Sequence, residues 1–329
     1  MLTGTYPSFK CNRPLEQEEK QAHLSYEVPQ LLEPDDAIAM IRFNSTFVEF
    51  VDRRFRIKGM AATLVLSSIS LFLLALFVLF VFNFWRTPGS MLEKAAVFLI
   101  LGGVAVGASA FFWMIFLRFD LCAYKFNPVR FNRKAQCIHF FVHNGPGGTV
   151  TVPWGRPSTF FHIGRGSQDK ELRDLRCHVL KDDLVTHTFT VGHYWRHENH
   201  VRGEWELIRR YMEDGPENAF DHPQDRVITL SPQGSWLNCY MWVCHALGTG
   251  LYKVRFLLFP IYGLLTLSRW LTFKSCRKPV WPPEVEASCA TEPDDPYRLP
   301  EPAFMGEFAQ DDAKYQRAAE RHQQRQSWK

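Results

Sequence analysis

Two long stretches without any charged residue constrain this chain more than any other feature. The first, residues 59–85, holds 27 residues and the second, residues 95–117, holds 23. At about 1.5 Å of rise per residue, helices over 60–83 and 95–117 are each roughly 35 Å long, whereas the hydrocarbon core of a bilayer is about 30 Å thick. We therefore expect a two-span transmembrane hairpin. The alternative is a pair of apolar core helices inside a soluble domain.

Basic residues flank both stretches, and Lys and Arg beside a span are retained on the cytoplasmic side. The first stretch follows Arg53, Arg54, Arg56 and Lys58, and the second precedes Arg118, Lys125, Arg130, Arg133 and Lys134. The connection at 86–94 has a Thr-Pro-Gly-Ser core, which is typical of a tight turn. We therefore expect a multi-pass protein with both termini cytoplasmic, and we expect the basic group before the first span to lie at the membrane interface.

Small residues in the second span predict how the spans pack. Gly103 and Gly107 have the small-x-x-x-small spacing that lets helix backbones approach closely. They predict either packing against the first span or a contact in a homo-oligomer. Neither span carries an ionisable residue at membrane depth, which argues against a transporter or a proton path.

The rest of the chain is water-soluble in composition. The mean hydropathy of the 329 residues is slightly negative, −0.18, despite the two apolar stretches. The net charge is +4 and forms no basic stripe, so we expect no nucleic-acid partner. The eight cysteines contain no C-x-x-C pair, and we expect free thiols.

After the second span the pattern changes from continuous apolarity to alternation, which is typical of strands. We expect strands at 119–127, 136–143, 149–154, 158–164, 174–180 and 184–191, with turns at 144–148 and 181–183. A helical period follows at 201–214 and ends at Gly215 and Pro216. Antiparallel strands closed by one amphipathic helix are the order of pleckstrin-homology-like domains. We therefore predict an α+β membrane protein with a cytoplasmic antiparallel β domain over 119–216, capped by a helix.

Three other regions complete the predicted organisation. Residues 34–58 are expected to form a lead-in helix, so that lead-in and hairpin together span 34–118. Residues 1–33 mix Pro, Glu and Lys with little period, and 279–329 combine a Pro-rich linker with a charged short helix. Such compositions predict flexible surface arms.

Residues 227–278 contain no Asp or Glu and are rich in aromatic and basic side chains. Such segments suit the bilayer interface, where each Lys or Arg near anionic lipid gains about 1 kcal/mol. We expect interfacial helices that contact anionic headgroups through Lys253, Arg255, Arg269 and Lys274. Two alternatives are a second hairpin over 236–252 and 256–272, and a cover for the open face of the sheet domain.

No motif predicts catalysis, a metal or a cofactor. The chain has no G-x-S-x-G, no H-E-x-x-H and no dinucleotide fingerprint, so we expect a binding protein rather than an enzyme. Two weak metal candidates lack the paired spacing of zinc motifs; these are Cys239, Cys244 and His245, and also His193, His197 and His200. The loop at 162–170 could cradle a phosphate, but it reads as an ordinary solvated turn.

A resemblance extends these expectations. The segments YKFNPVRFNRKAQCIHFF, GGTVTVPW and WELIRRYMEDGPE resemble an uncharacterised bacterial family of two-span inner-membrane proteins that are often encoded near type VI secretion effectors. The similarity covers about residues 35–220, and its motifs, Val152–Trp154 and Arg209–Pro216, are structural. Gly155 stands where the family pattern has Asp, so no carboxylate role is carried over to that position.

The resemblance implies a bacterial inner-membrane protein that binds a protein toxin or a secretion component. An immunity protein that neutralises an effector by binding is the first reading. An accessory or adaptor protein of the secretion system and a membrane-acting effector are the alternatives. Arg209 and Arg210, expected to be exposed on the capping helix, are the candidate partner contacts.

Overall fold

The computed structural model describes residues 2–3, 9–84, 86, 88–143, 148–155, 157–166, 169–254 and 256–326. The chain divides into two compact units. The sheet unit comprises Met1–Arg56, Phe126–Gln233 and Lys278–Lys329, and the helical unit comprises Ile57–Lys125 and Gly234–Arg277. The helical unit therefore consists of two insertions into the sequence of the sheet unit.

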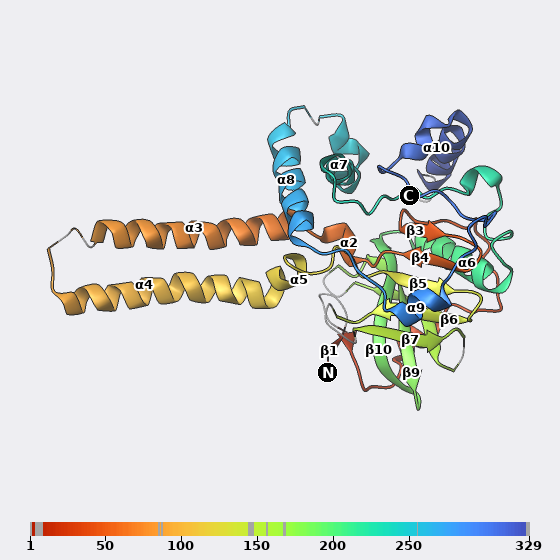
Figure 1. The fold of residues 1–329 in the computed structure, drawn as a ribbon, viewed down its shortest axis with the longest axis horizontal. Coiled ribbons are helices and arrows are strands. Elements are labelled where there is room, and N and C mark those ends of the chain that lie inside the picture. Colours follow the sequence, from red (N-terminus) through yellow and green to blue (C-terminus); the bar gives the residue numbers. More distant parts are fainter. Residues whose placement is uncertain are drawn as a thin grey trace. The chain divides into compact units, whose positions relative to one another are not determined.

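Two antiparallel sheets form the centre of the sheet unit (Figure 1). The five-stranded sheet has the order β3 (Met40–Phe43), β4 (Phe47–Phe50), β5 (Val129–Asn132), β6 (Cys137–Phe141) and β7 (Thr149–Pro153). The three-stranded sheet has the order β10 (Leu184–Trp195), β9 (Arg173–Lys181) and β8 (Thr159–Arg165). A further short pair joins β1 (Leu2–Thr3) and β2 (Phe9–Lys10).

Aromatic side chains fill the space between the two larger sheets. Phe140 of β6 stacks on Phe189 of β10 with ring centroids 4.3 Å apart, and Phe131 of β5 meets Phe161 of β8 at 6.2 Å. Trp205 of α6 (Glu198–Glu213) is fully buried and lies 4.7 Å from Phe161. Because α6 contributes its largest side chain to this core, it closes the sandwich, as the alternation followed by a helical period predicts.

The β9–β10 turn illustrates how local sequence determines the register. Lys181 pairs with Leu184, which leaves a two-residue loop, and both loop residues, Asp182 and Asp183, have positive φ angles of 52° and 61°. Positive φ at both central positions defines the type I′ turn, whose twist matches that of a hairpin. The predicted hairpin at 181–183 is confirmed. The predicted turn at 144–148 lies mostly outside the described residues.

Two predicted elements are wrong. Residues 34–58 form β3 and β4, followed by the short helix α2 (Arg54–Ile57), rather than one lead-in helix. Asn44 accepts hydrogen bonds from the backbone N–H groups of Thr46 and Phe47, and this local turn favours a hairpin over a helix. Residues 119–127 are not a strand, because the strand in this region, β5, begins only at Val129.

The chain ends are not loose arms in their described parts. Leu24 is 1% exposed, and the hydroxyl of Tyr26 donates to the backbone oxygen of Thr159 at 2.9 Å. At the other end, Trp281 donates its indole N–H to Glu49, 3.1 Å away. The remaining elements of the sheet unit are α1 (Gln17–Gln21), the 3-10 turns Pro223–Asp225 and Glu307–Gln310, α9 (Pro283–Ser288) and α10 (Asp312–Gln326).

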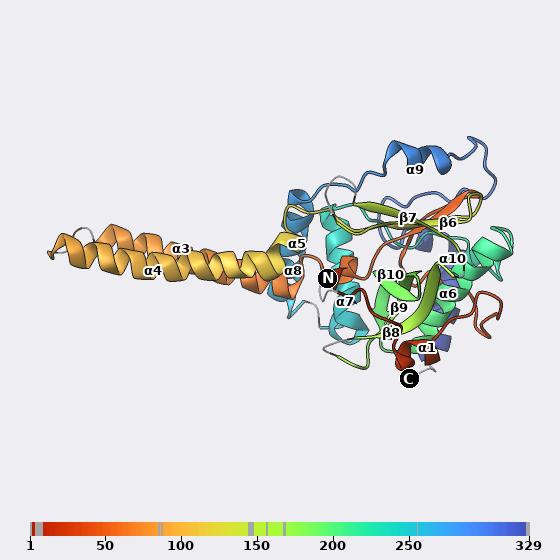
Figure 2. The same cartoon turned by 90° about the horizontal axis from the view of Figure 1, so that it is seen from below.

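The helical unit contains two helices long and apolar enough to cross a bilayer. These are α3 (Ala61–Phe84) and a continuous helix, Met91–Asp120, made of α4 (Met91–Phe112), a π-helical turn (Trp113–Leu117) and α5 (Arg118–Asp120). The two run side by side as an antiparallel pair (Figures 1 and 2). Ser90 caps α4 by accepting the N–H of Glu93, whose side chain reaches back to Ser90, so a capping box ends the loop.

A second helix pair belongs to the same unit. It consists of α7 (Trp236–Tyr252), which is kinked at Gly248, and α8 (Phe259–Ser275). Val243, Tyr262 and Leu265 form a buried cluster that also contacts Met60 and Leu64 of the α3 region. Gly59 has a positive φ of 71°, and an added Cβ would lie 2.7 Å from the Cα of Arg269. Only glycine therefore allows α8 to approach the start of α3 this closely.

Candidate functional site

The base of the apolar hairpin is organised by one acidic side chain. Asp120 accepts a hydrogen bond from the N–H of Gly59 at 3.0 Å and another from the hydroxyl of Thr63, so it ties the end of the second helix to the start of the first. The backbone oxygen of Asp120 accepts a hydrogen bond from the thiol of Cys276, the residue that follows α8. Asp120 is 1% exposed. The helical unit holds one other acid, Glu93, at the opposite end of the hairpin.

Two basic residues predicted at the membrane interface lie in this buried base instead. Lys58 and Arg269 are each 1% exposed. Lys58 Nζ donates to the backbone oxygen of Phe119 at 3.0 Å, and Arg269 Nη1 donates to the backbone oxygen of Lys58 at 2.6 Å. Burial lowers the pKa of Arg269 to about 9, and Cys239 and Asp120 oppose this shift, so the guanidinium stays charged at neutral pH. The prediction that these two side chains face headgroups is therefore wrong.

The turn between α7 and α8 is apolar and exposed. Phe256 and Leu257 are 81% and 82% exposed, and Val254, Phe259 and Ile261 are also exposed. Lys253 and Lys274 are exposed as well, so they remain available for the predicted headgroup contacts. Arg255 lies outside the described residues. An exposed apolar turn beside the exposed Lys253 has the composition of a segment that dips into a bilayer surface.

Three of the four basic residues before the first span belong to the sheet unit. Arg53 forms an ion pair with Asp174 at 2.5 Å, and Arg54 is buried. Arg56 donates to the backbone oxygen of Tyr194 at 2.8 Å. These arginines resemble the flank of a membrane span in sequence, yet they stabilise the sheet unit, and their assignment to the interface is wrong.

Gly103 and Gly107 of the second span do not contact the first span. A Cβ added at Gly103 or Gly107 would have nothing within 4 Å. Gly102 packs against the first span instead, because an added Cβ there would lie 2.8 Å from Cζ of Phe77. The prediction that Gly103 and Gly107 pack against the first span is wrong, because the neighbouring Gly102 faces that span instead. Their role in a homo-oligomer stays a prediction.

Arg209 and Arg210 are not the exposed contacts that the sequence predicts. Arg209 is 6% exposed and its Nη2 lies 2.8 Å from Oε1 of Glu206, which is fully buried. Arg210 binds the same carboxylate at 2.8 Å and Asp221 at 2.5 Å. Burial alone would raise the pKa of Glu206, but hydrogen bonds from Arg209, Gln30 and Arg210 lower it. Both arginines therefore serve the folded sheet unit.

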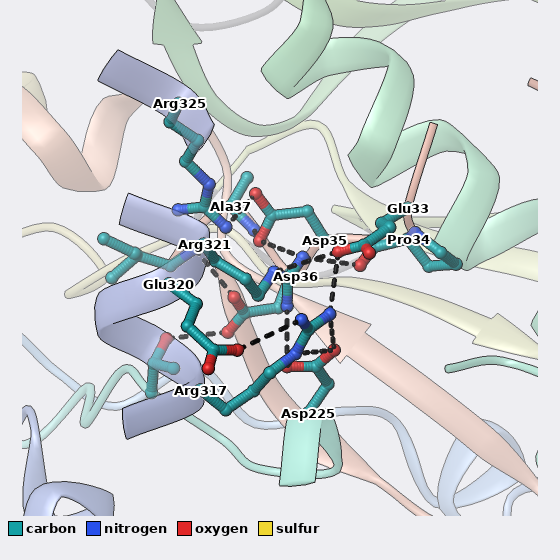
Figure 3. A network of polar contacts seen from close by, with 12 residues as sticks. Glu33, Pro34, Asp35, Asp36, Ala37, Asp225, Arg317, Glu320, Arg321 and Arg325 are labelled. Atoms are coloured by element: carbon teal, nitrogen blue, oxygen red, sulfur yellow. Dashed lines mark hydrogen bonds and ion pairs between the residues drawn. The ribbon is translucent and has the colours of Figure 1, made fainter. Parts of the chain in front are cut away.

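The C-terminal helix α10 is attached to the sheet unit by a charge cluster that we name the arginine clasp (Figure 3). Its arginines stand four residues apart and so share one helix face; they are Arg317, Arg321 and Arg325. They face four acids, Glu33, Asp35, Asp36 and Asp225. None of the described side chains of α10, residues 312–325, is buried, so charge rather than apolar burial holds this helix.

The distances in the arginine clasp are short. Arg317 Nη2 lies 2.8 Å from Glu33 and 3.1 Å from Asp225, Arg321 lies 3.2 Å from Asp225, and Arg325 lies 2.5 Å from Asp35. Burial alone would raise the pKa of Asp35, but Arg325, His200 and Arg321 lower it below its ordinary value. Asp35 therefore depends on Arg325 and Arg321 of α10, together with His200, to stay ionised.

Replacing one clasp residue should release α10. Arg321→Gln removes contacts to Asp225 and to the backbone oxygen of Pro34, and we expect a loss of about 1.5–3 kcal/mol, as for hydrogen bonds that involve a charged group. Faster proteolytic cleavage within α10 would report the release, and high salt should increase it in the wild type. Lys314→Gln is the control, since its partly exposed pair with Asp311 at 3.6 Å should contribute about 0–1 kcal/mol. Equal cleavage of both variants would contradict the clasp.

Next to the clasp lies a buried carboxyl group without a hydrogen-bond partner in the described part of the chain. Glu204 of α6 is fully buried and neither carboxyl oxygen is bonded. Burial, together with the charges of Asp35, Asp36 and Asp174, raises its pKa well above the ordinary value. Glu204 is therefore neutral where an exposed glutamate would be charged.

A raised carboxyl pKa has a defined effect on stability. The folded state holds the proton more tightly than the unfolded state, so stability falls as pH rises from the unfolded pKa of about 4.3 towards the folded pKa, by about 1.4 kcal/mol per pH unit. Glu204→Gln removes this contribution. We expect the thermal stability of the variant, relative to wild type, to increase as the pH rises above the unfolded pKa. A difference that does not change with pH would show that Glu204 titrates normally.

The metal candidates from the sequence are not brought together. His193 Nε2 lies 3.0 Å from the backbone oxygen of Ile38, and His200 Nδ1 lies 3.9 Å from Asp35. Among the described residues, neither the set His193, His197 and His200 nor the set Cys239, Cys244 and His245 brings three donor atoms together. A different set converges instead, formed by Glu19, His162 and His178, whose nearest donor atoms all lie within 4.8 Å of one another. Sequence reasoning could not find it, because its members come from three separate segments with no common motif.

Comparison with protein families adds one finding. A family described as a family of unknown function (DUF6708) matches residues 107–293. The chain belongs to this family. In this DUF6708 protein, the match begins within the second apolar helix, includes β5 to β10 and α6 to α9, and leaves out β3 and β4. Comparisons with curated proteins and with solved structures found no significant match. The match is consistent with the uncharacterised family that the sequence resembles, and it carries no functional assignment.

Proposed function

We propose that this protein is a membrane-anchored binding protein of the bacterial inner membrane. The observation that carries the proposal is the place of the apolar hairpin in the sheet unit. The hairpin lies between β4 and β5, and these two strands are paired, with Phe50 opposite Val129. The chain therefore leaves and re-enters the same sheet at neighbouring positions. Two spans inserted there return the chain to the side of the membrane from which it started.

The charge distribution supports a cytoplasmic position for the sheet unit. Lys125, Arg130, Arg133 and Lys134 follow the second span, and the loop at 86–94 has few charges. The pair α7 and α8 supports an interfacial role, because each helix has 17 residues, or roughly 26 Å at 1.5 Å per residue, which is short of the hydrocarbon core. The strands of two sheets followed by α6 also support the pleckstrin-homology-like order.

Reporter fusions to the full chain test the topology. A reporter that is active only in the cytoplasm should be active when it is fused after the C-terminus and inactive when it is inserted between Pro88 and Ser90. A reporter that is active only outside the cytoplasm should give the opposite pattern. Activity of the cytoplasmic reporter at the loop would refute the orientation, and activity at both sites would refute the spans.

The resemblance supports a more specific role. We propose that the protein protects its own cell from a type VI effector that acts at the inner membrane, and that it does so by binding rather than by chemistry. A binding domain that is anchored beside the inner membrane could meet an effector that acts at this membrane, which supports the proposed role. Because Arg209 and Arg210 are engaged within the fold, they are no longer candidates for the contact.

Competition between strains tests this role. Deleting the gene should sensitise cells to a neighbour that delivers the effector, and the intact protein should restore protection and co-purify with the effector. A hairpin variant with two arginines in each span is the control, because it should lose the anchor and with it protection. If the deletion strain competes as well as its parent, immunity is the wrong function. An accessory role in secretion would then be supported by loss of effector export in the same deletion strain.

A further inference from the structure

Three polar side chains from distant segments meet in the sheet unit. Glu19 lies in α1, His162 in β8 and His178 in β9. His178 Nε2 is 3.0 Å from Oε1 of Glu19 and 2.9 Å from Nε2 of His162. His178 is fully buried, His162 is 1% exposed, and the side chain of Glu19 is 11% exposed. Nothing in the proposed function uses this cluster.

Hydrogen bonds alone do not satisfy these atoms. If His178 Nε2 carries a proton, it can donate a hydrogen bond to Glu19. The same nitrogen then cannot accept a hydrogen bond from His162. If His162 Nε2 carries the proton instead, it can donate a hydrogen bond to His178 Nε2. That nitrogen then has no proton to donate to Glu19. In addition, His162 Nδ1 is buried and has no hydrogen-bond partner in the described part of the chain. Since buried polar atoms are almost always paired, this convergence of two nitrogens and one carboxylate oxygen needs another explanation.

The surroundings hold the cluster in a form that can donate lone pairs. Burial lowers the pKa of His162 to about 3 and also lowers the pKa of His178, so both rings are neutral at pH 7. Nδ1 of His178 lies 2.7 Å from the hydroxyl of Thr188. A hydrogen bond at one ring nitrogen orients a histidine and leaves the other nitrogen free to bind a metal ion.

Arg13 orients the third member. Its Nη1 donates to Oε2 of Glu19 at 2.8 Å and its Nη2 donates to Oε1 at 2.5 Å. This pair keeps Glu19 ionised, and a carboxylate oxygen can accept both a hydrogen bond and a metal ion through its separate lone pairs. Arg13 therefore acts on Glu19 as Thr188 acts on His178, by fixing the direction of a donor atom.

We propose that Glu19, His162 and His178 bind one divalent metal ion of the zinc class. Imidazole nitrogen and carboxylate oxygen are ordinary zinc ligands, and two histidines with one glutamate are an established set of three protein ligands. An ion held here joins α1 to the three-stranded sheet and so attaches the N-terminal segment to the fold. The ion accepts lone pairs from all three atoms at once, which no single proton can do.

Titration of the full chain in detergent tests the proposal. The protein is treated with a chelator, exchanged into metal-free buffer, and titrated with Zn²⁺ by calorimetry and with Co²⁺ by visible absorption. We expect about one equivalent of each ion, a tetrahedral-type Co²⁺ spectrum and slower proteolysis near α1 when Zn²⁺ is present. His162→Gln and His178→Gln should each weaken binding by about 100-fold or more, because loss of a ligand exceeds the 10- to 100-fold cost of losing its support.

His187→Gln is the matched control. His187 lies on β10 in the same sheet, is half-buried, and is not part of the cluster, so Zn²⁺ affinity should be unchanged. Glu19→Gln gives a second ligand variant that keeps the size of the side chain, and circular dichroism shows whether each variant folds. The absence of stoichiometric Zn²⁺ binding to the wild type would overturn the proposal without any variant. Equal binding by wild type and both histidine variants would overturn it as well.

Discussion

Asp120→Asn should lower the free energy of unfolding of the helical unit by about 3–5 kcal/mol, the usual cost of leaving a buried charge, here that of Arg269, without its counter-charge. Asp120 is the acid at the base of the hairpin, where Lys58 and Arg269 are both buried. The amide keeps the size of the side chain and can still accept hydrogen bonds from Gly59 and Thr63. The variant therefore removes charge rather than shape, and a large loss identifies charge as the cause.

The measurement is thermal unfolding of the full chain in detergent, together with the amount of protein recovered from membranes. Glu93→Gln is the control, because Glu93 is the other acid of the helical unit, is exposed, and can be replaced by glutamine in a capping box. We expect a change within about 0.5 kcal/mol for this surface substitution. If both variants unfold like the wild type, the base of the hairpin does not depend on the charge of Asp120.

The outcome at the base of the hairpin shows which parts of the structure a sequence can reveal. The two apolar helices were predictable because their signal is local: an uncharged stretch needs no information about its neighbours. The strands from β6 to β10 were predictable for the same reason, since each alternates and turns separate them along the chain. Lys58 and Arg269 were mistaken for interface residues, because a basic residue beside an apolar segment has the same sequence pattern whether it faces headgroups or a buried carbonyl.

Features that depend on distant partners could not be predicted. β3 and β4 pair with each other as a local hairpin, but β5, the other neighbour of β4, lies beyond the whole inserted apolar hairpin, so the rest of their sheet is distant in sequence. The arginine spacing of α10 is visible in the sequence, but its acidic partners, Glu33, Asp35 and Asp225, lie about a hundred to three hundred positions earlier, and the helix alone resembles a solvated tail. Glu19, His162 and His178 are likewise separated by strands and loops.

Gly192→Ala should be among the most destabilising single substitutions in the sheet unit. Gly192 has a positive φ of 62° within β10, at a point where β10 departs from regular pairing with β9. An added Cβ would also lie 1.9 Å from a carboxyl oxygen of Glu204. Backbone strain and overpacking each cost about 1–3 kcal/mol, so we expect a loss of about 4 kcal/mol in thermal unfolding.

Two further variants separate the causes. Gly155→Ala is the matched control, because Gly155 has a positive φ of 91° but nothing within 4 Å of an added Cβ, so only strain should appear, about 1–3 kcal/mol. Glu204→Ala in the Gly192→Ala background should recover the overpacking part, because the carboxyl group is gone, and should leave the strain. If Gly192→Ala costs no more than Gly155→Ala, the carboxyl of Glu204 yields to the methyl group. If the double variant recovers nothing, the contact between these two residues does not determine the stability of the sheet unit.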